Sequence, residues 1–133
     1  MRKFKVSLEK GLSPSPYKHE LAAAGIIADY FKSDILFLRR NPNASPDLLV
    51  EKTNQIWELK SPIGNGKRTI ANNLRNASHQ SKKVIIDLSR CKMNNENALA
   101  KINRYLNSGD STLEKLLVID KSKKVIDFFN KKA

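Results

Sequence analysis

The feature that most constrains the fold is a short run of β-branched apolar residues at 83–88, with the sequence Lys-Val-Ile-Ile-Asp-Leu. This composition is typical of a strand that is buried in a sheet. A predicted helix, from Lys67 or Arg68 to Ser81, comes directly before it, and another predicted strand precedes that helix. A strand–helix–strand connection is expected to cross over right-handed and to place its two strands parallel in one sheet. The chain is therefore predicted to be an α/β protein.

The remaining elements follow from residue spacing and turn residues. An Ala-rich stretch with apolar residues at helical spacing predicts a helix over 18–32. Mostly apolar and alternating segments, separated by Pro, Gly and Asn, predict strands. Strands are predicted at 34–40, at two places within 46–60 joined by a turn at 52–55, and at 115–119 and 124–129 around a turn at 121–123. A third helix is predicted over 95–107.

This order predicts a three-layer α/β sandwich with one mixed central sheet. The elements run helix, three strands, helix, strand, helix and two strands. Residues 1–17 are basic and interrupted by one Gly and two Pro, so they are expected to form an N-terminal arm, with a short strand over 4–8. Residues 18–133 are expected to form a single domain, because a chain of 133 residues can bury a core without disulfides.

The charge of the chain indicates a polyanionic partner. There are 25 Lys and Arg residues against 13 Asp and Glu residues, which leaves a formal charge of +12. Such an excess most often indicates nucleic acid, and an anionic membrane surface or an acidic binding protein are the alternatives. No apolar run reaches the ~18 residues of a membrane span. The single cysteine, Cys91, cannot form an internal disulfide.

The hairpin at 46–60 carries the residues of most chemical interest. Side chains alternate along a strand, so Glu58 and Lys60 point to one face while Trp57 and Leu59 point to the other, where they are expected in the core. Asp47 opens the preceding strand, across the turn. A carboxylate on one strand, with an acid and a lysine two residues apart on its neighbour, is the arrangement of a metal-dependent phosphodiester-cleaving site. The alternative is a surface hairpin with an ordinary Glu and Lys on its solvated face.

The first predicted helix contributes a third carboxylate. Glu20 shares a helix face with Ala24, Ile27 and Phe31, and a carboxylate on a face that packs toward a sheet is costly unless a cation meets it. The structural alternative is that a Glu near a helix N-terminus interacts favourably with the helix dipole. Together, Glu20, Asp47 and Glu58 predict a site with oxygen ligands for Mg²⁺, with Mn²⁺ or Zn²⁺ as alternatives. Lys60 would orient the attacking water or stabilise the developing charge.

A basic segment follows the hairpin. Between 60 and 92 there are eight Lys or Arg residues and one acid, which accounts for +7 of the total charge. A glycine loop at 64–66 leads into the second helix and has no Walker A spacing, so nucleoside triphosphate binding is rejected. A solvated face would normally mix charges of both signs, so the segment is predicted to be a nucleic-acid track, in which Lys67 and Arg68 reach a phosphate. The alternative for the glycine loop is a simple loop and helix cap. The cations of this track are Lys60, Lys67, Arg68, Arg75, Lys82, Lys83, Arg90 and Lys92.

The two histidines are weaker candidates. His79 in the second helix is a candidate general base, and His19 adjoins Glu20. For each the alternative is an ordinary surface or hydrogen-bonded histidine.

Pro46-Asp47 followed by Glu58-Leu59-Lys60, after a helix with Glu20, resembles the PD-(D/E)XK nuclease superfamily. The order of the elements is similar to the restriction-endonuclease-like core of that superfamily, α-β-β-β-α-β, here followed by a helix and two strands. More narrowly, Trp57 to Pro62 with Gly64-Asn65, Gln80-Ser81 and 84–88 are similar to the nuclease toxin domains at the C-terminus of contact-dependent growth inhibition proteins.

The resemblance implies that Glu20, Asp47 and Glu58 hold metal, that Lys60 is catalytic, and that Gln80 contacts substrate. It further implies transfer RNA as the frequent target, DNA as the less frequent one, and an acidic immunity protein as a partner. The site of action would be the cytoplasm, after delivery from another bacterial cell within a larger secreted protein. Because the chain begins at Met1 without a delivery region, it is expected to be either an excised domain or a stand-alone relative.

The function expected from the sequence is therefore that of a metal-dependent nuclease acting on RNA. A DNA endonuclease of the same fold is one alternative. A nucleic-acid-binding module without catalysis, in which these acids are structural, is another.

Overall fold

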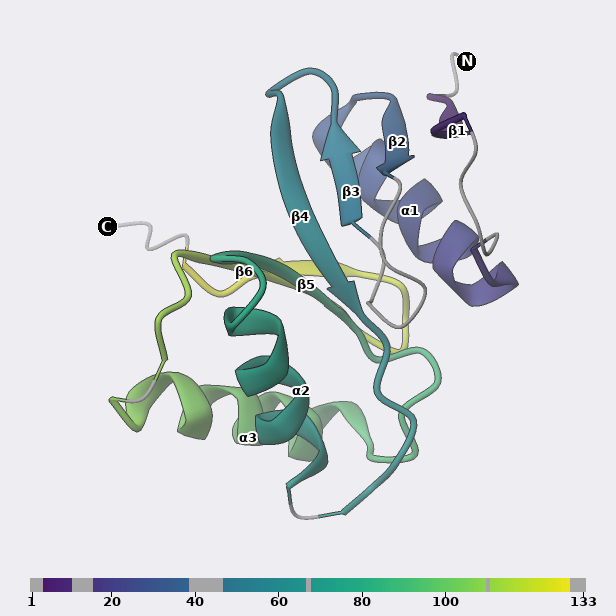
Figure 1. Ribbon diagram of the computed structural model, residues 1–133. Coiled ribbons are helices and arrows are strands. Elements are labelled where there is room, and N and C mark those ends of the chain that lie inside the picture. The colour runs from purple at the N-terminus through teal and green to yellow at the C-terminus, as the bar shows by residue number, and fades with distance from the viewer. Residues whose placement is uncertain (1–3, 11–15, 39–46, 67, 110, 130–133) are drawn as a thin grey trace. The chain divides into compact units, whose positions relative to one another are not determined.

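The computed structural model describes residues 4–10, 16–38, 47–66, 68–109 and 111–129. This part of the chain contains three helices and seven strands, so the protein is a mixed α/β protein as predicted. The chain divides into two compact units, residues 1–59 and 60–133. Both units combine parallel and antiparallel strand pairs with helix (Figure 1). No helix in the described ranges is long and apolar enough to cross a membrane.

The first unit contains one helix and four strands in the order β1-β2-β3-β4. β1 pairs parallel with β2, and β2–β3 and β3–β4 are antiparallel. The predicted short strand near the N-terminus is confirmed as β1, and it is hydrogen-bonded into this sheet. Residues 39–46, which include the end of the predicted strand 34–40, lie outside the described residues. The elements are β1 (Val6–Leu8), α1 (Lys18–Phe31), β2 (Ile35–Leu38), β3 (Asp47–Val50) and β4 (Gln55–Lys60).

Helix α1 packs on β1, β2 and β3 through small residues (Figure 1). Its buried residues are Ala23, Ala24, Ile27 and Ala28, and the three small alanine side chains let the helix approach the strands closely. The helix ends where Lys32 takes a left-handed conformation with φ 55°, and the Lys32 N–H donates to the carbonyl of Ala28. This is a common way to satisfy the last carbonyl groups of a helix.

The hairpin of β3 and β4 forms where it was predicted. Asn54 lies in the turn with φ 58°, a conformation that Asn tolerates better than most residues. Its N–H donates to the carbonyl of Val50 at 2.8 Å, which closes the turn. Trp57 and Leu59 are buried, as predicted. The Trp57 ring lies 5.7 Å from the ring of Phe31 on α1, so this face of the hairpin is the one turned toward the helix.

The second unit contains two helices and three strands in the order β5-β6-β7. β5 and β6 are parallel and are connected through α3, while β6 and β7 are antiparallel. The predicted strand at 83–88 is therefore confirmed, and its central residues are buried. The elements are α2 (Thr69–Ser78), β5 (Lys83–Asp87), α3 (Asn95–Asn107), β6 (Lys115–Ile119) and β7 (Val125–Asp127).

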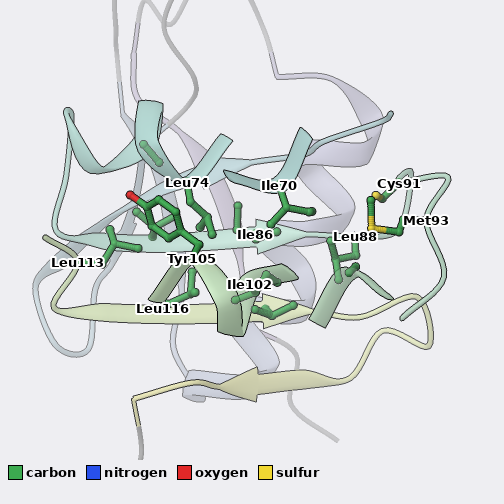
Figure 2. Close-up of a cluster of buried hydrophobic side chains, with 14 residues drawn as sticks. Ile70, Leu74, Ile86, Leu88, Cys91, Met93, Ile102, Tyr105, Leu113 and Leu116 are labelled. Carbon is green, nitrogen blue, oxygen red and sulfur yellow. The ribbon is translucent and has the colours of Figure 1, made fainter. Parts of the chain in front are cut away.

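The core of the second unit lies between its two helices and one face of its strands (Figure 2). Ile70 and Leu74 from α2 and Ile102 from α3 pack with Ile86 from β5 and Leu116 from β6. All five side chains are fully buried. Burying such side chains stabilises a fold by roughly 1.5–3 kcal/mol each, which makes this cluster the main support for α2 and α3.

Helix α2 is shorter than predicted. The sequence predicted a helix from 67 or 68 to 81, whereas α2 covers Thr69–Ser78. After it, the N–H groups of Gln80 and Ser81 both donate to the carbonyl of Ala77 at 2.9 Å. These bonds form one last, tightened turn after α2, and β5 begins two residues later, at Lys83. Gln80 and Lys82 therefore lie in the connection after α2.

Candidate active site

Asp47 and Glu58 lie directly opposite each other on β3 and β4. The antiparallel register pairs Asp47 with Glu58, Leu48 with Trp57 and Leu49 with Ile56. Opposite residues share a face, and their Cβ atoms are typically about 4.5–5.5 Å apart. The two carboxylates are therefore neighbours, as the sequence predicted. Two like charges in this position destabilise a sheet unless a cation accompanies them.

The Glu58 side chain is fully buried, at 0% exposure. An ionised carboxylate in the interior is costly unless it is paired, hydrogen-bonded or bound to a metal. The alternative of a surface hairpin, with an ordinary Glu on its solvated face, is therefore wrong for Glu58. Asp47 is half-buried. The pair thus combines one carboxylate in the interior with one that solvent or substrate can reach.

Lys60 is the last residue of β4 and is half-buried. It follows Glu58 by two residues on the same strand, and side chains alternate along a strand, so both point to the same face. The structure therefore keeps the predicted arrangement of Asp47, Glu58 and Lys60 on the hairpin.

Glu20 has a different setting from the other two acids. It is half-buried in the first turn of α1, and its Oε1 accepts a hydrogen bond of 2.8 Å from the N–H of Tyr17, the N-cap residue. This bond satisfies a backbone donor at the helix start. Helix α1 faces the Trp57 side of the hairpin, whereas Glu58 points to the opposite side. The predicted three-carboxylate group is not assembled: within the described ranges no three His, Cys, Asp or Glu side chains gather closely enough to hold a metal ion.

The residues that are together still suit a hard cation. Mg²⁺ prefers oxygen ligands and is usually held by one or two carboxylates, with water and substrate phosphate completing its coordination. Asp47 and Glu58 supply two carboxylates in register. The buried position of Glu58 also gives a bound cation a function in the fold, because it would offset an interior negative charge. The two carboxylates therefore suit a Mg²⁺ ion whose remaining ligands are water and substrate phosphate, and not an ion whose ligands all come from the protein.

Helix α2 presents a polar face with two arginines. Ile70, Leu74 and Ala77 are buried on one side, while Arg68 at the N-cap and Arg75 in the last turn are exposed. Exposed polar residues continue the Arg68–Arg75 face at spacings of three and four. The exposed residues of this face are Arg68, Asn72, Arg75, Asn76 and His79, and we call them the α2 polar face.

The other predicted substrate contacts lie beside this face in the chain. Gln80 and Lys82 are exposed in the connection after α2. Lys67 lies outside the described residues. Asn72 was not predicted: its Oδ1 accepts a hydrogen bond of 3.3 Å from the guanidinium of Arg75. The spacing of three residues between Asn72 and Arg75 was the available signal in the sequence.

The positive charge is concentrated in the second unit. Residues 60–133 contain 16 Lys or Arg and 6 Asp or Glu, a net +10, whereas residues 1–59 contain 9 and 7, a net +2. The predicted basic track is thus part of a whole unit with strong positive charge. Such a unit attracts polyanions over distances comparable to the Debye length, about 8–10 Å at physiological salt.

Cys91 and the two histidines have ordinary settings. Cys91 is buried, and its Sγ donates to the carbonyl of Gly64 at 3.3 Å. His79 is exposed at the C-cap of α2. The ring of His19 stacks on that of Tyr17 at a centroid distance of 5.6 Å.

A pocket of about 340 Å³ in the first unit is separate from the acidic pair. Glu51 and Lys52 in its lining directly follow the end of β3 that is remote from Asp47. It is open and lined by charges of both signs, and it contains none of the predicted site residues. The lining residues are Phe4, Lys32, Ser33, Asp34, Glu51 and Lys52.

Comparison with known proteins agrees with this fold. The chain is similar to a solved structure of the CdiA-CT/CdiI toxin and immunity complex from Burkholderia pseudomallei, with a TM-score of 0.56 and 19% sequence identity. The match covers 91% of this chain and 97% of the other. At this identity, the likeness concerns the fold alone. No curated protein matches the chain in sequence.

The family model for the contact-dependent growth inhibition CdiA C-terminal domain matches residues 44–125. The matched range includes Asp47, Glu58 and Lys60, all of α2, and most of the second unit. It covers more than half of the chain. The chain therefore belongs to the family of contact-dependent growth inhibition CdiA C-terminal domains.

Proposed function

We propose that this chain is a toxin domain of contact-dependent growth inhibition that hydrolyses phosphodiester bonds in nucleic acid. The family supports the toxin role. The observation that carries the nuclease proposal is the fully buried Glu58, in register with Asp47 and followed by Lys60 on the same strand. An interior carboxylate opposite a second one suits a cation-binding site.

The residues of the hairpin would divide the chemistry among them. Asp47 and Glu58 would hold a divalent cation, Mg²⁺ in the first instance, which neutralises charge at the phosphate when bound. Lys60 would orient the attacking water or donate to a phosphoryl oxygen on which charge develops. Glu20 is not part of this pair, and its carboxylate accepts the Tyr17 N–H at the start of α1.

Substrate binding is assigned to residues of the second unit. Arg68 and Arg75 on the α2 polar face, with Gln80 and Lys82 after it, present donors and positive charge to phosphate oxygens. Contacts of this kind position a nucleic acid and carry no sequence information by themselves. We propose RNA, and transfer RNA in particular, as the substrate, with DNA as the alternative.

A cognate immunity protein is the proposed protein partner. The similar Burkholderia structure is a toxin and immunity complex. A partner that covers a unit with a net charge of +10 is expected to present acidic residues, because complementary charge speeds association and favours the correct partner. The proposed place of action is the cytoplasm of the receiving cell, after delivery as part of a larger protein.

Incubation of the purified chain with total tRNA and with plasmid DNA tests the proposal, with Mg²⁺ and with excess EDTA. Cleavage of tRNA in Mg²⁺, and none in EDTA, is expected. Glu58→Gln keeps the size of the side chain and removes its charge, and Lys60→Met keeps its length and removes its charge. Each is expected to abolish cleavage while circular dichroism still shows a folded protein.

The turn of the same hairpin provides matched controls. Glu51→Gln and Lys52→Met make the same chemical changes at exposed turn positions and are expected to leave cleavage unchanged. Full activity of Glu58→Gln, or full activity in EDTA, would refute the metal-dependent mechanism. Cleavage of plasmid alone would favour the DNA endonuclease. Salt-sensitive binding without cleavage in any metal would favour a non-catalytic binding module.

A further inference from the structure

Tyr17 is an exposed aromatic residue at the start of α1. Its side chain is 67% exposed, the highest value among the exposed large hydrophobic residues of the described ranges. It occupies the N-cap position, where Ser, Thr, Asp and Asn are preferred because their side chains accept a backbone hydrogen bond. Because so much of the Tyr17 side chain is exposed, its ring contributes little to the core.

The Tyr17 ring is nevertheless held in place. It stacks on the ring of His19 with a centroid distance of 5.6 Å and an interplanar angle of 10°. The backbone beneath it is fixed at both ends, because the Tyr17 N–H donates to Glu20 Oε1 at 2.8 Å and its carbonyl accepts from the Leu21 N–H at 3.0 Å. With so much of its surface exposed, Tyr17 presents to solvent a flat aromatic surface that is backed by a second ring.

From this geometry we propose that the Tyr17–His19 ring pair binds an unpaired nucleobase by stacking. A base stacks on an aromatic ring through its π-face, and this interaction tolerates any base. A nucleotide suits this position, because the exposed cation Lys18 lies between the two ring residues in sequence. The occupant is thus a single-stranded segment of nucleic acid, with one base against Tyr17 and a phosphate within reach of Lys18.

This inference rests on the proposed function only in that the ligand is nucleic acid. It does not require cleavage, so it is tested by binding alone. It also adds a contact from the first unit, whereas the α2 polar face belongs to the second. Since the same backbone bond joins Tyr17 to Glu20, a base at this position would lie beside a residue that the sequence assigned to catalysis.

The test measures the affinity of the full chain for a fluorescein-labelled, 2′-O-methyl single-stranded RNA by fluorescence anisotropy in EDTA. The methylated ribose and the chelator keep the oligonucleotide intact. Tyr17→Leu is expected to weaken binding about 5- to 150-fold, the range that corresponds to loss of one base–aromatic stack. Tyr17→Trp is expected to retain or increase affinity, because it presents a larger ring.

Tyr30 provides a matched control on the same helix. It is 41% exposed, but it meets Phe31 edge to face, at an interplanar angle of 79°, and so offers no parallel pair. Tyr30→Leu is expected to leave the affinity unchanged. The slope of log K against log salt is expected to be the same for Tyr17→Leu and wild type, because stacking releases no counterions.

The outcomes distinguish this inference from the proposed function. Equal affinity of Tyr17→Leu and wild type overturns the ring-pair site and leaves the nuclease proposal standing; that result is also expected if the ring pair serves a protein partner. The site is also overturned if Tyr17→Leu weakens binding of the fully annealed duplex as much as binding of the single strand, because bases inside a duplex are stacked on their neighbours and do not reach Tyr17. Tyr17-dependent binding without cleavage under any metal supports the ring-pair site and contradicts the nuclease.

Discussion

Removing the two arginines of the α2 polar face is predicted to reduce the salt dependence of RNA binding by a definite amount. Arg68 and Arg75 are seven residues apart, which corresponds to about 10.5 Å along a helix at 1.5 Å per residue. Successive phosphates of one strand are about 3.4 Å apart along a duplex axis, so the two side chains are far enough apart to contact different phosphates. Both are exposed, and their removal disturbs no buried contact.

The expected magnitude follows from counterion release. Each phosphate contact contributes roughly 0.7 to the slope of log K against log salt for a single strand and 0.9 for a duplex. The Arg68→Ala/Arg75→Ala double variant should therefore have a slope about 1.4 to 1.8 smaller in magnitude. Between about 50 and 200 mM salt, wild type should lose roughly tenfold more affinity than the double variant.

Fluorescence anisotropy with a non-cleavable RNA at several salt concentrations measures this slope. The matched control is Arg104→Ala/Lys115→Ala, which removes the same charge from exposed positions on α3 and β6. The control is expected to keep a slope close to that of wild type. An unchanged slope in the α2 double variant would refute the assignment of this face to phosphate. An equal reduction in both double variants would show that net charge, and not the α2 polar face, governs binding.

Three further predictions concern the supports of the fold. Glu20→Ala should lower the free energy of unfolding by about 1 kcal/mol, while Glu20→Gln, which still accepts the Tyr17 N–H, should lower it much less in urea denaturation; equal losses would exclude capping as the role of this side chain. Asn94 Oδ1 accepts a hydrogen bond of 2.8 Å from the Asn97 N–H, so Asn94→Ala should lower the free energy of unfolding by about 1 kcal/mol. An unaltered melting temperature would contradict the role of Asn94 as N-cap of α3. In the core of the second unit, Ile86→Ala should lower the free energy of unfolding by about 2–5 kcal/mol and Ile86→Val by about 0.5–1.5 kcal/mol, measured by the same denaturation. Similar small losses for both variants would mean that this position is not closely packed.

Local chemistry made most elements predictable. Asn95–Asn107 matches the predicted third helix, because its apolar stripe recurs at helical spacing and Asn94 caps its start. The hairpin turn was predicted at 52–55, and Asn54 in it accepts the left-handed conformation that the turn requires. The end of α2 was placed too late, because residues 79–81 contain neither Gly nor Pro as a stop signal and still bond to the last turn of the helix.

The candidate site divides in the same way. Alternation along the strands was enough to place Glu58 and Lys60 on one face and Trp57 on the other, and the short turn was enough to bring Asp47 across from them. The sequence could not decide whether Glu58 faces solvent or the interior. Burial is a property of everything that packs around a residue, and the same alternating pattern is compatible with both.

Two features of the N-terminal region were decided by tertiary structure alone. Val6 pairs with Ile35 in a parallel ladder, so the strand predicted over 4–8 has its partner 29 residues away in sequence, and no local pattern specifies that pairing. Glu20 has the spacing of a core-facing carboxylate, yet its Oε1 accepts from the Tyr17 backbone. The sequence thus determined which segments are helix and strand, since periodicity and turn residues act within a few positions. Which carboxylates meet, and how deeply Glu58 is buried, depended on long-range packing, which those local preferences do not specify.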